Sequence, residues 1–179
     1  MASFDKPLVI VVTGVSGSGK NTIGKAVALR LGWPFQEGDL MHEAANIEKM
    51  RNGEALTDQD RLPWLRRVAD WIHAQLGAGR SGVVTCSALK RSYRDLLRQG
   101  RPDVLFILLQ APQAVITPRL AARHGHFMPA VLLPSQYAAL EPPAASEDVV
   151  AIDAAQAIDR IVDEVIAEAE RRAGGPRLH

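Results

Sequence analysis

The segment that most constrains this chain is a glycine-rich loop, GVSGSGK at residues 14–20, which joins an apolar run to an amphipathic segment. The run 8–12 is short and rich in β-branched residues, as expected of a buried strand. Over residues 20–31 apolar side chains recur at helical spacing. A strand, a glycine loop and a helix in this order predict backbone N–H groups turned toward phosphate oxygens at the positive end of the helix.

This loop predicts a site for a nucleoside triphosphate such as ATP. Lys20 is expected to reach the β- and γ-phosphates as a mobile point charge. A glycine-rich turn that holds a lysine by coincidence is the alternative, and the flanking strand and helix favour the functional interpretation. The predicted nucleotide-binding residues are Gly14, Val15, Ser16, Gly17, Ser18, Gly19, Lys20, Asn21 and Thr22.

One position departs from the usual phosphate-loop pattern. The residue after the lysine is normally Ser or Thr, whose hydroxyl binds Mg²⁺, and here it is Asn21. Thr22 cannot simply replace it, because neighbouring helix positions point about 100° apart. The Asn21 amide oxygen could bind the metal or a bridging water. A nucleotide-binding module with weak or no catalysis is therefore an alternative function.

Two acidic residues follow the second expected strand. Glu37 and Asp39 are two positions apart, so both side chains project to the same side if the backbone is extended there. Ligands of open α/β sheets bind at the carboxyl ends of the strands. We therefore expect Glu37, with Asn21, to help hold Mg²⁺, and Asp39 to orient a hydroxyl or accept its proton. A solvated acidic turn is the alternative.

Short β-branched runs alternate with longer helical patterns, which predicts a parallel sheet with helices on both faces. The expected architecture is α/β, a three-layer phosphate-loop NTPase fold with a five-stranded sheet. One domain over residues 1–173 and a disordered tail over 174–179 are expected. The expected strands are 8–12, 34–37, 82–86, 104–109 and 149–152, and the expected helices are 20–31, 42–52, 62–76, 90–99, 112–122 and 155–171.

Composition excludes several classes of partner. The 21 Lys and Arg residues against 20 Asp and Glu residues leave a net charge of +1, so no overall field attracts nucleic acid or an anionic membrane. The only cysteine, Cys86, excludes an intramolecular disulfide and suits the cytoplasm. The run 8–12 is too short for a signal-peptide core, and no stretch approaches the roughly 20 apolar residues of a membrane span. We expect a cytoplasmic protein without nucleic-acid or membrane partners.

Several further blocks of sequence resemble the gluconokinases. The match extends from about Val9 to Ile152, and several of its blocks are specific to that family rather than to phosphate-loop proteins at large. The blocks that carry the resemblance are Gly38–His42, Asn46–Met50, Gly53–Arg61, Pro63–Leu65, Cys86–Lys90, Tyr93–Arg98 and Arg119–Phe127.

The resemblance implies ATP-dependent phosphorylation of D-gluconate to 6-phospho-D-gluconate, on a fold similar to the shikimate and nucleoside monophosphate kinases. It implies that Asp39 engages the reacting hydroxyl. A kinase for another small polyol acid is the alternative within this class, and the resemblance also points to a homodimer. The residues that the resemblance places at the sugar-acid site are Asp39, His42, Asn46, Lys49, Arg61, Ser87 and Lys90.

Arg119 and Arg123 are four positions apart and lead into the segment 124–127. The resemblance implies a lid over about 119–135, which would bring these guanidinium groups onto the transferred phosphoryl group. An ordinary basic helix end is the alternative. Because proline inside a helix costs about 3 kcal/mol, we expect Thr117 to cap a new helix with Pro118 in its first turn.

Overall fold

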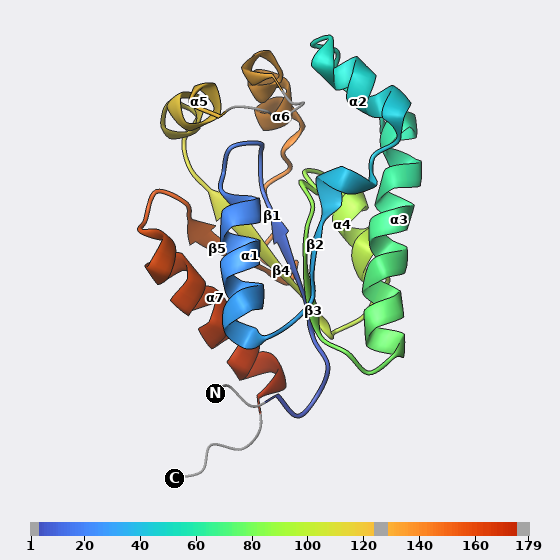
Figure 1. Cartoon of the computed structure of the whole chain (residues 1–179), viewed down its shortest axis with the longest axis vertical. Coiled ribbons are helices and arrows are strands. Elements are labelled where there is room, and N and C mark those ends of the chain that lie inside the picture. Colours follow the sequence, from blue (N-terminus) through green and yellow to red (C-terminus); the bar gives the residue numbers. More distant parts are fainter. Residues whose placement is uncertain (1–3, 124–128, 175–179) are drawn as a thin grey trace.

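The structure, a computed structural model of the chain, describes residues 4–123 and 129–174. Its centre is a five-stranded parallel sheet in the order β2-β3-β1-β4-β5 (Figure 1). Each strand lies within one residue of its predicted bounds, so the predicted sheet is confirmed. The strands are β1 (Val9–Thr13), β2 (Phe35–Glu37), β3 (Gly82–Thr85), β4 (Val104–Gln110) and β5 (Val149–Asp153).

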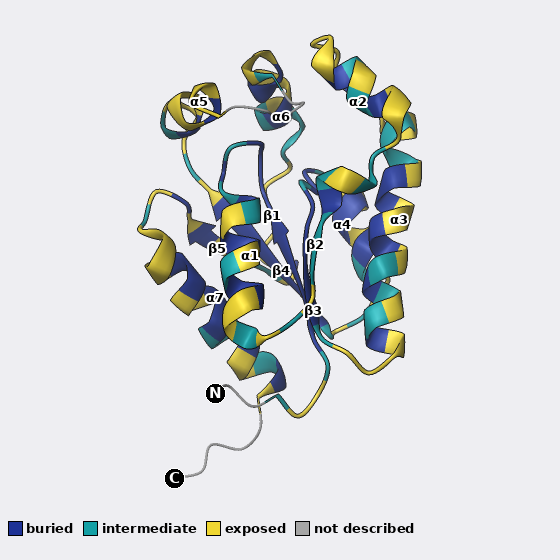
Figure 2. Ribbon diagram, viewed as in Figure 1, coloured by how far each residue is buried: buried dark blue, intermediate teal, exposed yellow. Residues whose placement is uncertain are grey.

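Helices cover both faces of the sheet, as the sequence predicts. On one face lie α1 (Lys20–Leu31) and α7 (Ile158–Ala173), and on the other lie α3 (Asp58–Gly77) and α4 (Arg91–Arg98) (Figure 1). The central strands are buried from both sides (Figure 2). Along β1, Ile10 belongs to the core under α1 and α7, whereas Val11 belongs to the core under α3 and α4. This alternation produces the three predicted layers.

The remaining elements lie beyond the carboxyl ends of the strands (Figure 1). They are the 3-10 turns η1 (Gly38–Met41) and η2 (Ala130–Leu132) and the helices α2 (Ala44–Arg51), α5 (Gln113–Ala121) and α6 (Leu133–Ala139). The chain leaves β1 toward α1 on one face and leaves the adjacent β3 toward α4 on the other. The connections therefore diverge between β1 and β3, which is where open α/β sheets bind ligands.

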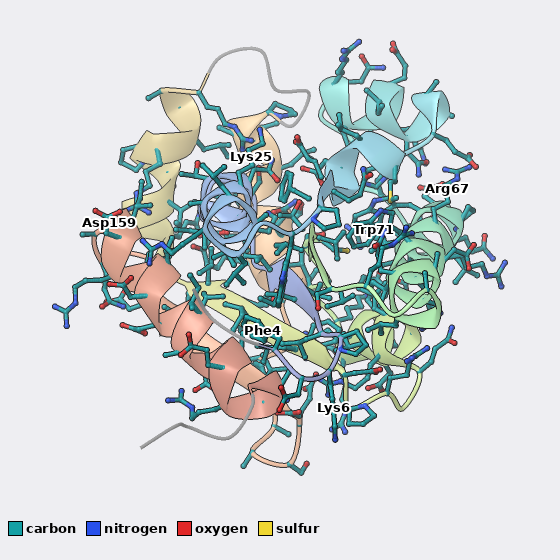
Figure 3. All side chains as sticks on the ribbon, turned by 60° about the horizontal axis from the view of Figure 1, so that its bottom comes forward. Phe4, Lys6, Lys25, Arg67, Trp71 and Asp159 are labelled. Carbon is teal, nitrogen blue, oxygen red and sulfur yellow. The ribbon has the colours of Figure 1, made fainter. Side chains whose placement is uncertain are left out.

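The amino-terminal segment lies at the opposite end of the molecule from the loop between β1 and α1. Phe4, which is labelled in Figure 3, packs edge-on against Trp33 with ring centroids 4.7 Å apart. It also forms an isolated antiparallel bridge with Gly174. The tail predicted at 174–179 lies mostly outside the described residues. Among the helices that the structure describes, none is long and apolar enough to cross a bilayer.

Two predicted helix starts are wrong for identifiable reasons, and α7 begins at Ile158 rather than at residue 155. Helix α3 begins at Asp58 rather than at residue 62, because Thr57 and Asp60 form a reciprocal capping box. Helix α5 runs through Pro118, so no new helix begins at Thr117, whose hydroxyl donates to the Gln113 carbonyl. The buried Ile116 and Leu120 flank the proline and pack in one apolar cluster, which favours one continuous helix over two.

Gly38 of η1 lies too close to β3 for a side chain, because a Cβ atom there would lie 1.8 Å from the Thr85 carbonyl oxygen. We predict that Gly38→Ala lowers the free energy of unfolding by at least about 2 kcal/mol, since the backbone must shift. Gly77, the last residue of α3, has nothing within 4 Å of the place that a Cβ atom would take and serves as the control. Gly77→Ala should be neutral or stabilising by less than about 1 kcal/mol. Urea unfolding tests both variants, and equal losses would contradict the prediction.

Candidate active site

The loop between β1 and α1 has the backbone of a phosphate-binding loop. Gly14, Gly17 and Gly19 adopt φ values of 143°, 81° and 98°, which favour glycine. Ser16 and Ser18 are buried, and their hydroxyl oxygens have no hydrogen-bond partner among the residues that the structure describes. Buried hydroxyls usually find a partner. Phosphate oxygens would supply one here, so the loop fits a nucleoside triphosphate.

Lys20 begins α1 and is held against this loop. Its side chain donates from Nζ to the Val15 carbonyl oxygen at 3.0 Å, and the residue is only 8% exposed. Burial lowers the pKa of Lys20, the carboxylate of Asp39 opposes that shift, and the guanidinium of Arg123 adds to it. A phosphate group in the loop would favour the charged lysine and so offset the cost of burying it.

Two pockets meet at Lys20 and Asp39, which are the two described residues that line both. The larger pocket has a volume of about 500 Å³ and follows the phosphate loop and the first turns of α1 to Ile158 of α7. Arg119 and Arg123 form part of its wall. Arg119 also donates to the Ala154 carbonyl oxygen at 2.9 Å. The predicted lid segment that follows, residues 124–128, lies outside the described residues.

The smaller pocket has a volume of about 30 Å³ and lies on the other side of Lys20 and Asp39. Met50, Leu56 and Leu132 form an apolar cluster on its wall, which joins α2 to η2. Its polar lining includes the predicted residues His42, Arg61 and Ser87, together with Ser135 and Gln136.

Asn21 is fixed by hydrogen bonds at both ends of its amide. Its Nδ2 donates to Glu37 Oε1 at 2.7 Å, and its Oδ1 accepts from the Thr85 hydroxyl at 2.8 Å. The Thr85 hydroxyl in turn accepts from the Gly38 N–H at 3.2 Å, so its own hydrogen is free for Asn21. One lone pair of Oδ1 remains for another partner. The described residues contain no cluster of three or more His, Cys, Asp or Glu side chains suited to a metal.

His42 stacks on Trp64, with ring centroids 4.0 Å apart and an interplanar angle of 18°. Trp64 is fixed in turn, because its Nε1 donates to the Gly38 carbonyl oxygen at 2.8 Å. Burial lowers the pKa of His42 to about 4, with Asp39 opposing the shift and Arg61 adding to it. His42 is therefore neutral at pH 7 and can both donate and accept a hydrogen bond.

A buried arginine positions the loop that carries Ser87. Arg94 donates to the carbonyl oxygens of Ala88 at 3.1 Å and Leu89 at 3.0 Å, and it pairs with the buried Glu147. Ala88 adopts a φ of 41°, which is unusual for a residue other than glycine. These bonds hold a strained backbone turn in place, and Ser87 at the pocket wall depends on that turn.

Three of the predicted sugar-acid residues lie outside both pockets. Lys49 pairs with Asp60 at 2.8 Å, and Asn46 donates to the Asp60 carbonyl oxygen at 2.8 Å. Lys90 pairs with Asp58 at 2.8 Å. All three contacts hold the first turn of α3, the helix that carries Arg61 to the pocket.

Sequence reasoning missed the contribution of α6. The stretch 134–146 predicts a surface loop and a short helix, and that short helix supplies Ser135 and Gln136 to the smaller pocket. Gln136 is buried and its Oε1 accepts from the Ser16 N–H at 2.6 Å. Leu133, Gln136 and Tyr137 stand at helical spacing, so a polar residue on the inner side of this short helix was the available signal.

The loop, its lysine and its place beside β1 and β3 define a phosphate-loop nucleotide-binding protein. Residues 9–143 match the family described as an AAA domain. A gluconokinase of Gluconobacter oxydans (strain 621H) is 48% identical over 161 residues, which are 90% of each chain. The structure of a gluconokinase from Sinorhizobium meliloti 1021 has a TM-score of 0.82 at 44% identity, covering 96% of this chain and 95% of its own.

A sugar kinase from Janibacter sp. HTCC2649 is also similar, with a TM-score of 0.84 at 46% identity over 90% of this chain and 93% of its own. The chain belongs to the gluconokinase family, which confirms the resemblance found in its sequence blocks.

The lowered pKa of His42 predicts a specific dependence of stability on pH. In the unfolded chain a histidine titrates near about 6.5, whereas folded His42 titrates at about 4. Between these values the unfolded state binds the extra proton, so stability falls as the pH falls below about 6.5. From pH 7 to pH 5 this contribution amounts to about 2 kcal/mol.

The comparison is between the wild type and His42→Gln. Urea unfolding at pH 7 and pH 5 should show that the wild type loses about 2 kcal/mol more than the variant over this interval. Absolute stabilities will also differ because the stack on Trp64 changes, so the difference between the two pH values is the informative quantity. Equal pH dependences in the two proteins would contradict a neutral, buried His42.

Proposed function

We propose that the protein transfers the γ-phosphoryl group of ATP to the 6-hydroxyl of D-gluconate, giving ADP and 6-phospho-D-gluconate. The observation that carries this proposal is the meeting of two pockets at Lys20 and Asp39. A triphosphate in the larger pocket would end where an acceptor in the smaller pocket begins. Membership of the gluconokinase family supports gluconate as the acceptor. The single, buried Cys86 supports a cytoplasmic enzyme.

On the nucleotide side, binding relies on positive charge and backbone donors. The loop from Gly14 to Thr22 would hold the phosphates, and Lys20 would move from the Val15 carbonyl oxygen to the β- and γ-phosphates. Arg119 and Arg123, which line the same pocket, would neutralise charge that develops on the transferred group. We also assign residues 119–135 to a lid that excludes water from the reacting groups.

On the acceptor side, Asp39 would accept the proton of the 6-hydroxyl while the oxygen of that hydroxyl attacks the γ-phosphorus in line. The bond from the γ-phosphorus to the β,γ-bridging oxygen breaks, and ADP leaves. Arg61 is the cation suited to the carboxylate of the acid, and neutral His42 and Ser87 suit its hydroxyls.

We assign Asn46, Lys49 and Lys90 an indirect part in acceptor binding. Their bonds to Asp58 and Asp60 fix the start of α3 and thereby the position of Arg61. The smaller pocket, at about 30 Å³, must widen to admit a six-carbon acid. Separation of α2 from η2 at the cluster of Met50, Leu56 and Leu132 would provide that space.

Mg²⁺ when bound would neutralise charge between the β- and γ-phosphates. Asn21 and Glu37 are the residues that would hold it, through an amide oxygen and a carboxylate. This pair fits a hard cation that takes oxygen ligands, uses few protein groups and keeps several waters. Asn21 also holds the Glu37 carboxylate by a hydrogen bond. An asparagine at this position, where phosphate loops usually have Ser or Thr, is therefore compatible with catalysis.

The proposal predicts ADP release that depends on D-gluconate. Coupled ADP release with ATP and Mg²⁺ should be at background without an acceptor and with shikimate. Asp39→Asn should lower kcat by at least about 100-fold, because the general base is lost. Asp70→Asn, at an exposed position of α3, is the matched control and should retain wild-type kcat. ATP binding without turnover in the wild type would instead favour the nucleotide-binding module.

A second prediction concerns Asn21. Asn21→Ala should raise the Mg²⁺ concentration for half-maximal turnover by about tenfold, because Glu37 loses the bond that positions it. Mn²⁺ binding to the nucleotide-bound protein, followed by electron paramagnetic resonance without acceptor, should weaken to a similar extent. Asn52→Ala, at an exposed position after α2, is the control. Unchanged metal affinity would remove Asn21 from the metal site, and faster turnover in Asn21→Ser would show that asparagine impairs the enzyme.

A further inference from the structure

Gln136 of α6 contacts the phosphate loop from a distant part of the chain. The Ser16 N–H belongs to the loop that should surround phosphate oxygens, yet it donates at 2.6 Å to a side chain of α6. Helix α6 is itself anchored, because Leu133 packs in the cluster that contains Val15, and the Tyr137 hydroxyl donates to the Ala111 carbonyl oxygen at 2.7 Å. The position of the Gln136 amide is therefore fixed by the anchoring of α6.

The chemistry of this bond fixes the orientation of the amide. Because the Ser16 N–H is a donor, the Gln136 atom that meets it must be Oε1, and Nε2 points elsewhere. Gln136 is 6% exposed, and its only side-chain hydrogen bond with a described residue is the one that Oε1 accepts from Ser16. The residue lines the smaller pocket together with Ser87 and Ser135. Two donor hydrogens are thus available at the wall of the acceptor pocket.

We propose that Gln136 is an acceptor-binding residue that also positions the phosphate loop. Its Nε2 donates to an oxygen of the sugar acid, while its Oε1 holds Ser16. This inference rests on the proposed function, since it requires an oxygen-rich acceptor in the smaller pocket. The Nε2 end of the amide has no described protein partner at the pocket wall, and a ligand hydroxyl or carboxylate oxygen would supply one.

The two bonds of one rigid amide couple the two pockets. A shift of Gln136 that follows acceptor binding moves the Ser16 N–H, and Ser16 stands next to the part of the loop that lines the nucleotide pocket. Acceptor binding therefore adjusts the loop for the nucleotide, and the apparent affinity for one substrate depends on the other. By linkage the effect on the two binding affinities is reciprocal.

Two variants distinguish an acceptor-binding role from a purely structural contact between α6 and the loop. Gln136→Glu keeps an oxygen for the Ser16 N–H but removes both donor hydrogens and places a negative charge near an anionic acceptor. Gln136→Met has a similar length and removes both functions. Gln113→Glu makes the same chemical change at an exposed position of α5 and is the control.

The experiment measures kcat, the KM values for D-gluconate and ATP, and calorimetric binding of each ligand alone. In Gln136→Glu we expect the KM for gluconate to rise at least about tenfold, while ADP affinity without acceptor stays within about twofold of the wild type. In Gln136→Met we expect both gluconate and nucleotide affinities to weaken, and the KM for ATP to become independent of the gluconate concentration. Gln113→Glu should match the wild type throughout.

A wild-type KM for gluconate in Gln136→Glu would overturn the inference and leave Gln136 with only its structural contact to Ser16. If Gln136→Met does not fold, as judged by its thermal unfolding, the Gln136→Glu result still decides. The proposed function has a separate test, since absence of gluconate-dependent turnover in the wild type would refute it. In that case calorimetric binding of gluconate to the wild type and to Gln136→Glu still shows whether Gln136 recognises the acid, and equal binding or none overturns the inference.

Discussion

The arrangement of the site depends on the contact between Gly38 and Thr85, where the end of β2 meets the end of β3. The Gly38 N–H donates to the Thr85 hydroxyl, which donates to Asn21 at the start of α1. The Gly38 carbonyl oxygen accepts from Trp64 of α3. One residue without a side chain thus connects both faces of the sheet, and the next residue along the chain is Asp39. Any atom larger than hydrogen at position 38 would separate these elements.

The residue after Gly38 is Asp39, and its carboxylate and the Lys20 ammonium are the two charges at the centre of the site. Asp39 lies beside Lys20 at the junction of two pockets, and Lys20 is buried at a cost that its carboxylate neighbour only partly offsets. A buried cation with one carbonyl partner is prepared for an anion, because phosphate oxygens restore the interactions that burial removed. The free-energy cost of burying the Lys20 charge is present in the protein alone, and bound nucleotide would offset it. Such an arrangement suits a reaction governed by positioning and charge.

The smaller pocket, in contrast, is assembled from segments far apart in the chain. His42 follows η1, Arg61 comes from α3, Ser87 sits on the turn held by Arg94, and Gln136 comes from α6. Several are fixed by contacts with neighbouring residues, such as the stack of His42 on Trp64. Lys49 and Lys90 form ion pairs with the first turn of α3, which carries Arg61. They therefore support the pocket wall but do not line the pocket.

The sequence by itself determined the sheet, the phosphate loop from Gly14 to Lys20, and the family, because these depend on local periodicity and on glycines and lysine at fixed spacing. It also predicted a site role for Asp39, which the structure places where the two pockets meet. Only the tertiary structure decided which cations face the pocket, that Asn21 bonds to Glu37, and that Gln136 reaches Ser16. Those contacts join residues separated by 16 and 120 positions. Local patterns do not specify such pairs, because the packing of whole helices on the sheet selects them.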